Sequence, residues 1–470
     1  MTRIFTLLFL IAGFNSIGQY NNEWINYNQQ YYKFKVGSKG LYRIPKSVLD
    51  NAGIGNTSVE YFELWRNGEK VPFYTSTSSG PLGSGGYIEF WGEGNDGKPD
   101  KALYRNPLYQ HNSERSLFTD TAVYFLSVNT NQSGFRYTDV NNDVAGNVLP
   151  AESYFMHKSG VYYNTKINPG FAAVVGEYVY SSSYDKGEWW SSGPIRPGTP
   201  LTTAISGLPV YTSGPDATLK YGVMGDALNA RNVRVSVNGN LLQDTIMDYF
   251  TDINSAVAVP LSMISSGTVS VNFANTSVIG TDRFVASYFE INYPRLFDFD
   301  NQKSFKFSLP ASSAKYLEIT NFDGGAAPVL LNLTNGQRIV GNTDVAGMVR
   351  FVIGAGGARD FVLVNTDASS VTNVTGLTQK VFKQFLNAGN QGDYIIISNK
   401  ALYAGTSGNN PIEDYKNYRS SATGGGYNVT IVDIDELVDQ FGLGIKKNPL
   451  SIKNFLRYAR NNFSVEPKFC

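Results

Sequence analysis

The sequence predicts a multidomain, mainly β protein whose C-terminal stretch is the first part of an α/β domain. Aromatic residues make up 14% of the chain and charged residues only 17%, a composition typical of strands rich in Tyr and Phe. Short alternating apolar runs recur between turns containing Gly, Asn and Pro, which favours β-sandwich or jelly-roll-like domains. From Gly392 to Cys470 the pattern changes to apolar strands separated by helices, the order that indicates a parallel sheet.

The first segment, Met1–Gly18, has the form of a signal peptide. Arg3 gives a positive start, an apolar run follows, and small residues precede Gln19. This run is too short for a spanning helix, and no other stretch of the chain is long enough. The sequence therefore predicts export to the periplasm, outer membrane or cell surface, without a transmembrane helix in the mature chain.

An N-terminal β domain is predicted from residue 19 to residue 150. Asn67-Gly68 lies between two strand-like runs and suits the positive φ angles of a type I′ hairpin turn. Residues 45–52 are expected to form one short helix.

A glycine-rich stretch, Gly92–Gly97, fits the spacing of a dinucleotide-binding loop and follows a predicted strand. Such a loop needs a helix N-terminus after it, and no helical periodicity follows, so a turn is the preferred interpretation. The carboxylates and amide between Glu93 and Asp100 could hold calcium, but the full calcium-loop spacing is missing. The sequence leaves calcium binding open.

A β-sandwich domain is predicted from residue 151 to residue 300, with a hairpin turn at Asn238-Gly239. Its neighbouring tryptophans, Trp189 and Trp190, could stack on a sugar, but aromatic pairs mostly fill space, so a core position is preferred. A smaller β domain follows from residue 301 to residue 390. Its last part, Gln379 to Asn387, is expected to be a linker helix.

The final segment, residues 391–470, alternates strands with helices. The predicted strands are Asp393–Ser398, Tyr427–Val432 and a third beginning at Lys468, and the predicted helices start at Asn410-Pro411, Asp433 and Asn448-Pro449. Asn and Asp suit helix caps, and Pro suits the first helical position. A helix between two strands implies a right-handed crossover, so the first two strands are expected to be parallel neighbours.

Two parts of the chain resemble a known family. DYIIISNKALY, DYKNYRSSATGGGYNVTIVDIDELVDQFGLG and PLSIKNFLRYA resemble the opening of the gingipain-type cysteine peptidase domain, which has a caspase-like fold. EWINYNQQYYKFKVGSKGLYRI, FWGEGNDGKPD and SLFTDTAVYFL resemble the N-terminal region of PorU-type sortases of type IX secretion. The resemblance implies that the catalytic His and Cys follow later strands, so the chain is expected to be truncated near the start of its peptidase domain.

No catalytic residue, cofactor site or metal site is predicted within the chain. His111 and His157 have no nucleophile nearby in sequence and are interpreted as surface or structural residues. Cys470 enters a strand and is expected to be a buried structural thiol, without a local base. One cysteine and two histidines cannot form an ordinary zinc site, and 39 basic residues balance 39 acidic ones, so no net charge attracts nucleic acid.

Three functions remain open at this point. The resemblance implies a sortase that cleaves C-terminal signals from exported cargo and joins the cargo to a lipopolysaccharide anchor at the cell surface. Its implied partners are cargo proteins and other type IX secretion components. The alternatives are a secreted gingipain-like endopeptidase and a non-enzymatic surface or carbohydrate-binding β protein.

Overall fold

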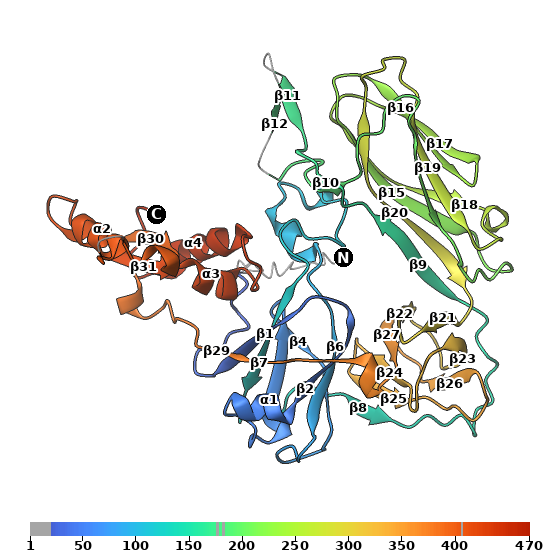
Figure 1. The fold of residues 1–470 in the computed structure, drawn as a ribbon, viewed down its shortest axis with the longest axis horizontal. Helices are drawn as coiled ribbons and strands as arrows, with labels where there is room; N and C mark the ends of the chain where they lie inside the picture. The colour runs from blue at the N-terminus through green and yellow to red at the C-terminus, as the bar shows by residue number, and fades with distance from the viewer. Residues whose placement is uncertain (1–19, 175–177, 181–183, 406–407) are drawn as a thin grey trace, which may run out of the picture. The chain divides into compact units, whose positions relative to one another are not determined.

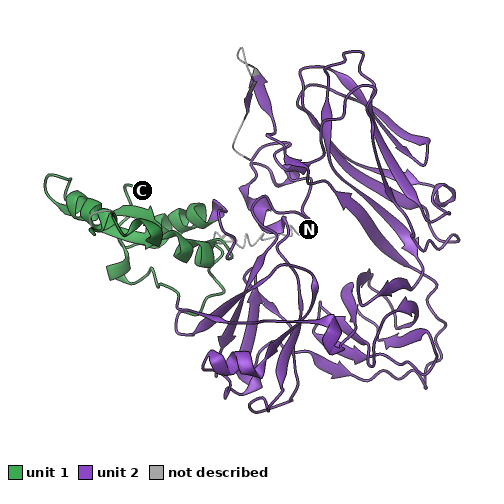
Figure 2. Ribbon diagram, viewed as in Figure 1, with its two compact units in different colours: residues 1–26, 382–443, 451–470 green, residues 27–381, 444–450 purple. Residues whose placement is uncertain are grey.

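The computed structural model describes residues 20–174, 178–180, 184–405 and 408–470 (Figure 1). The described residues form two compact units, a smaller one that includes 20–26, 382–443 and 451–470 and a larger one that includes 27–381 and 444–450 (Figure 2). The predicted signal peptide, Met1–Gly18, lies outside the described residues. Within the described ranges no helix combines the length and apolar character needed to cross a membrane.

The first part of the larger unit is built from two sheets, with strand orders β29-β1-β7-β3-β4 and β28-β2-β6-β5. Their strands are β1 (Tyr31–Val36), β2 (Gly40–Pro45), β3 (Phe62–Arg66), β4 (Glu69–Val71), β5 (Tyr74–Thr75), β6 (Tyr87–Gly92), β7 (Ala122–Val128), β28 (Val371–Asn373) and β29 (Thr378–Lys380). Asn67 and Gly68, with φ of 52° and 79°, make the predicted I′ turn. Helix α1 (Lys46–Asn51) confirms the short helix, and Phe34, Phe90 and Tyr124 pack together in the core.

The predicted linker helix from Gln379 to Asn387 is wrong. Residues 378–380 instead form β29, which pairs antiparallel with β1, and residues 381–387 have no regular structure. The physical reason is that β1 has unpaired backbone groups on the side away from β7, and a returning strand satisfies them. Local sequence cannot reveal a strand partner that lies more than three hundred residues earlier in the chain.

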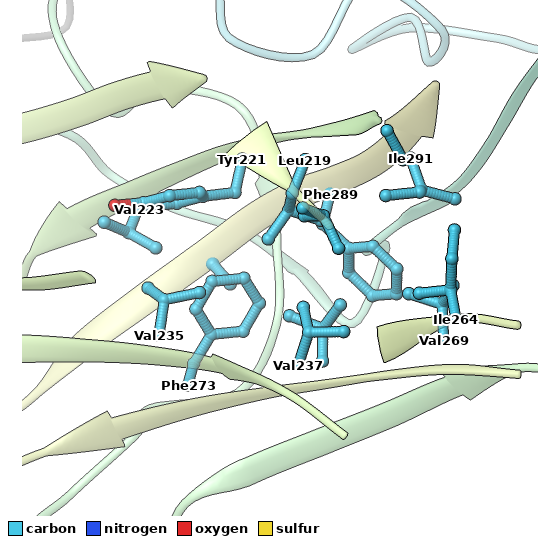
Figure 3. Close-up of a cluster of buried hydrophobic side chains, with 14 of the residues drawn as sticks. Leu219, Tyr221, Val223, Val235, Val237, Ile264, Val269, Phe273, Phe289 and Ile291 are labelled. Carbon is cyan, nitrogen blue, oxygen red and sulfur yellow. The ribbon is translucent and has the colours of Figure 1, made fainter. Parts of the chain in front are cut away.

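The β-sandwich has two four-stranded sheets, β18-β15-β20-β9 and β14-β19-β16-β17. Their strands are β9 (Phe155–Tyr162), β14 (Leu201–Ile205), β15 (Ala217–Gly225), β16 (Arg231–Val237), β17 (Asn240–Met247), β18 (Asp252–Val259), β19 (Val269–Asn275) and β20 (Phe284–Arg295). The inner faces interdigitate in a dry core, where Leu219 and Phe289 from one sheet meet Val235 and Phe273 from the other (Figure 3). Buried and more exposed side chains alternate along β16 and β19, whereas β20 is buried along almost its whole length.

A third sheet pair follows in the larger unit, with strand orders β22-β27-β24-β25-β8 and β21-β23-β26. The strands are β8 (Thr138–Val140), β21 (Asp298–Gln302), β22 (Ser304–Leu309), β23 (Lys315–Phe322), β24 (Val329–Asn332), β25 (Gln337–Val340), β26 (Met348–Ile353) and β27 (Arg359–Val364). Phenylalanines fill its core, and Phe299 stacks on Phe305 with ring centroids 4.0 Å apart.

Short elements complete the larger unit. They are the strands β10 (Lys166–Ile167), β11 (Ala172–Val174), β12 (Tyr178–Tyr180) and β13 (Trp190–Ser191), and the 3-10 helices η1 (Val59–Tyr61), η2 (Lys98–Leu103), η3 (Pro107–Tyr109), η4 (Leu261–Met263) and η5 (Ala368–Ser370).

The smaller unit contains the predicted α/β segment. Its elements are η6 (Ala388–Asn390), β30 (Tyr394–Ser398), η7 (Lys400–Leu402), α2 (Pro411–Ser420), β31 (Val429–Asp433), α3 (Ile434–Phe441) and α4 (Leu450–Asn462). β30 and β31 are parallel, as predicted for two strands joined through a helix. Ile395, Val432 and Phe455 are almost fully buried between the strands and the helices. The mainly β fold that ends in an α/β segment is therefore confirmed.

Candidate functional site

The smaller unit brings the carboxyl ends of two parallel strands to one edge. Ser398 ends β30, Asp433 ends β31, and the two residues are register partners. On the other side of β30, Phe469 forms an isolated parallel bridge with Tyr394, and Phe469 O accepts a hydrogen bond of 2.9 Å from Ile395 N, the position predicted for a third strand. The strand order therefore reverses at β30, and open α/β sheets bind ligands outside the carboxyl ends of strands at such a reversal.

Two polar side chains at this edge cap the helices that follow the strands. Asp433 Oδ1 accepts a hydrogen bond of 2.8 Å from Asp435 N, which starts α3, and Asn399 Oδ1 accepts one of 2.9 Å from Ala401 N. Ser398 Oγ and Asp433 Oδ2 are buried atoms without a hydrogen-bond partner among the described residues. This edge offers a hydroxyl and a carboxylate oxygen, which can orient another group but do not form a nucleophile–base pair.

Cys470 lies at the opposite edge of the sheet, and the prediction of a buried thiol is wrong. Its side chain is exposed, although the preceding Phe469 forms a bridge with Tyr394 of β30. Partial burial still raises the pKa of the thiol above its usual value. Since Phe469 pairs with the first residue of β30, Cys470 lies three residues before Ser398, roughly 10 Å along the sheet.

His111 is a buried residue of the larger unit. Its Nε2 lies 2.8 Å from Asp252 Oδ2, and its ring stacks on Trp189 with centroids 5.1 Å apart. Burial alone would raise the pKa of Asp252, but its hydrogen bond with His111 and the charge of Lys186 at 3.2 Å lower it below its usual value. His111 makes no hydrogen bond to a serine, threonine or cysteine side chain in the described part of the chain.

His157 is packed among aromatic rings, 5.1 Å from the Phe305 centroid and 5.6 Å from that of Phe155. Burial, followed by the positive charge of Arg295, lowers the pKa of His157 to about 4. An imidazole in this setting stays neutral at physiological pH. The two histidines therefore have separate surroundings, and neither faces a nucleophile among the described side chains.

The glycine-rich turn after β6 is held by its own polar partners. Asp100 is fully buried, and its Oδ2 accepts hydrogen bonds of 2.8 Å from Ser116 Oγ and Leu117 N. Burial raises the pKa of Asp100 to about 6 in spite of these bonds. Glu93 is paired with Lys306 at 2.7 Å.

The element after the turn is η2, six residues of 3-10 helix, so some helical structure does follow the glycines. Lys98 donates to the Asp96 carboxylate through its backbone N at 3.0 Å and through Nζ at 2.9 Å. No group of three or more His, Cys, Asp or Glu side chains is arranged to hold a metal ion in the described ranges. Calcium binding between Glu93 and Asp100 stays an untested possibility.

The two tryptophans differ in burial. Trp189 is 1% exposed, whereas Trp190 is half-buried and its Nε1 donates a hydrogen bond of 2.8 Å to Ser116 O. The core interpretation therefore agrees with the structure for Trp189.

Comparison with protein families identifies the kind of domain to which the parallel sheet belongs. Residues 387–469 match the profile of Peptidase family C25, so the smaller unit carries a segment typical of this cysteine peptidase family. Comparison with curated proteins found no match.

The structure is similar to one particular protein over nearly its whole length. Dimeric latent PorU from Porphyromonas gingivalis superposes with a TM-score of 0.59 over 94% of this chain, at 14% sequence identity. The chain spans 41% of the length of that PorU chain. At this identity the match shows a shared fold, and with the C25 segment it supports a PorU-type protein of the gingipain family, as the sequence predicts.

Two other matches are confined to part of the chain. A carbohydrate-binding module CBM36 in complex with calcium and xylotriose covers 28% of this chain and 98% of its own, at 12% identity and a TM-score of 0.19. The CBM36-1 domain of a multidomain xylanase from the hindgut metagenome of Trinervitermes trinervoides covers 29% and 96%, at 7% identity and a TM-score of 0.19. TM-scores this low carry no argument about fold or ligand.

Proposed function

We propose that these residues are the N-terminal part of a type IX secretion sortase, a cysteine peptidase that cleaves the C-terminal signals of exported cargo and attaches the cargo to the cell surface. The observation that carries the proposal is the order of the parallel strands. β31, β30 and the strand beginning at Phe469 reproduce the start of a doubly wound sheet inside the C25 segment, in a chain that shares the PorU fold.

The chemistry that catalysis needs indicates that the catalytic residues come from other strands than β30 and β31. A catalytic Cys needs a base that generates its thiolate and donors that stabilise the oxyanion. Among the described residues, Cys470 lies near the amino edge of the sheet, while both histidines belong to the larger unit. The catalytic pair is therefore expected on later strands of the same sheet, whose carboxyl ends would lie at the edge formed by Ser398 and Asp433.

A sortase of this kind meets exported cargo proteins and other type IX secretion components outside the cytoplasm. The signal-peptide pattern of Met1–Gly18 supports export, and peptide mapping of the mature N-terminus from periplasmic and outer-membrane fractions tests it. Recovery of an intact Met1 from cytoplasm would contradict export.

Cargo processing tests the function directly. The gene is deleted in its host, and restored with the 470-residue frame or with that frame extended by the coding sequence that follows. Cargo that keeps its C-terminal signal after deletion, and loses it only with the extended form, supports a sortase. Normal cargo processing in the deletion strain, together with cleavage of unrelated proteins by the secreted extended form, would instead indicate a gingipain-like endopeptidase.

A further inference from the structure

The larger unit contains an open cleft of about 800 Å³, a volume typical of sites that enclose a small ligand. Its floor is the outer face of the sheet β18-β15-β20-β9. Leu219, Phe289 and Ile291 point from this sheet into the sandwich core (Figure 3), and the residues that alternate with them line the cleft. The turns 37–39 and 93–98 and strand β22 contribute the other walls.

Polar side chains form two rows across the floor. Thr218 of β15 lies opposite Asn292 of β20, and Lys220 lies opposite Glu290 in the next row of the same face. The side chains of Thr218, Lys220 and Asn292 make no hydrogen bond or ion pair with another described residue. The Thr218 hydroxyl, the Lys220 ammonium group and the Asn292 amide, on adjacent strands, are therefore available to hydrogen-bond a ligand.

Three ion pairs also line the cleft, Lys158–Glu290 at 3.2 Å, Lys306–Glu93 at 2.7 Å and Lys98–Asp96 at 2.9 Å. Lys39, Glu114 and Asp120 add further charged side chains to its walls. Burial alone would raise the pKa of Glu93, but the charge and hydrogen bond of Lys306 lower it to about 2. Glu93 therefore stays ionised at neutral pH and is held by Lys306.

These three side-chain groups indicate which class of ligand the cleft binds. A hydroxyl and an amide both donate and accept, and an ammonium offers three donors, which together match the hydroxyl groups of a saccharide. A peptide cannot pair as a strand with β15 or β20, which carry Thr218, Lys220 and Asn292, because both already pair with a strand on each side. At the end of the floor, Tyr162 provides an aromatic ring whose hydroxyl is fixed by Glu290.

We propose that this cleft is a saccharide-binding site, in which Thr218, Lys220 and Asn292 hydrogen-bond the hydroxyl groups of a short oligosaccharide. Gly160, opposite Glu290 on β9, keeps the floor low: a Cβ there would lie 3.0 Å from Glu290 Cγ and 3.3 Å from Tyr162 Oη. All these residues belong to the larger unit, so binding does not depend on the peptidase activity proposed above.

Glycan-array binding followed by calorimetry tests the site in the chain without its predicted signal peptide, residues 19–470. The probes are soluble neutral, amino and uronic-acid oligosaccharides of two to six sugar units, with a panel of decapeptides on the same array. We expect saturable saccharide binding that weakens about tenfold in each of Thr218→Ala, Lys220→Ala and Asn292→Ala, since each loses a hydrogen bond to the ligand. Each variant should keep the melting temperature of the parent chain.

Matched controls lie outside the cleft. Thr245→Ala on β17 of the other sheet and Lys35→Ala on β1 remove the same chemical groups, and both should bind like the parent chain. Failure of every oligosaccharide to bind would overturn the proposal, as would binding that the three cleft substitutions leave unchanged. Selective capture of decapeptides, lost in the same three variants, would assign the cleft to a peptide and also contradict it.

Discussion

The side-chain amide of Asn461 donates a hydrogen bond of 2.8 Å to the hydroxyl of Tyr20, 441 residues earlier in the chain. The Tyr20 ring also meets Tyr458 edge-on, with centroids 5.5 Å apart, and Trp24 meets Phe382 in the same way at 5.6 Å. The first described residues are thus part of the smaller unit, beside helix α4. The segment resembling a peptidase is completed by the chain's N-terminal region.

Tyr20→Ala should destabilise the smaller unit by about 2 kcal/mol, because it removes one aromatic contact and one hydrogen bond. Denaturant unfolding measures the loss, and hydrogen exchange should locate it in α4. Tyr418→Ala, in a tyrosine of α2 that is 51% exposed, is the control and should change little. Equal effects of the two substitutions would show that the contacts of Tyr20 contribute nothing specific.

The second prediction concerns Phe455, which α4 places in the core of the smaller unit. Phe455 is 0% exposed and packs against Phe385 and Phe441, so Phe455→Ala should cost about 3–5 kcal/mol of unfolding free energy through lost burial and a cavity. Ile452, on the same helix but 36% exposed, supplies the control, and Ile452→Ala should cost far less. A similar loss in both variants would mean that α4 does not bury the face that carries Phe455.

Because its pKa is lowered in the folded chain, His157 should make the unfolding free energy depend on pH. Its pKa of about 4 lies below the ordinary 6.5, so the unfolded chain takes up a proton in this window while the folded chain does not. Stability should therefore fall as pH drops from 6.5 to 4, by up to about 1.4 kcal/mol per pH unit from this residue. The difference in unfolding free energy between parent and His157→Phe should follow that slope, and a difference independent of pH would refute it.

Cys470 predicts the outcome of thiol labelling. The chain has one cysteine, which is exposed, so a disulfide reagent should modify one thiol per folded chain without denaturant. The raised pKa should make the reaction slower than that of a free cysteine at neutral pH. Cys470→Ser, which should not react at all, is the control. Labelling that requires denaturant would instead show that the thiol is buried in the folded chain.

Elements defined by local chemistry could be predicted from the sequence. Asn67-Gly68 and Asn238-Gly239 both adopt the positive φ angles that their hairpins need. Asn410 caps α2 as expected, with its Oδ1 accepting hydrogen bonds from Ile412 N and Glu413 N. The parallel pairing of β30 and β31 followed from an apolar run, a helix and a second apolar run.

Features that depend on distant pairing could not be predicted. β29 was mistaken for a helix because its partner, β1, lies at the other end of the sequence. The exposure of Cys470 depends on how many strands cover it, which its own residue type does not reveal. Thr218 and Asn292 meet only through the register of β15 and β20, so polar residues at alternate strand positions were the one available signal for the cleft.

The central claim is that the catalytic cysteine lies on a later strand of the sheet that β30 and β31 begin. A peptide-based thiol-directed probe, reacted with the 470-residue chain and with a form extended by the following coding sequence, tests it most directly when the labelled residue is identified by mass spectrometry. We expect turnover-dependent labelling of a downstream cysteine in the extended form, lost when that cysteine is replaced. Turnover by the 470-residue chain with the probe on Cys470 would contradict it.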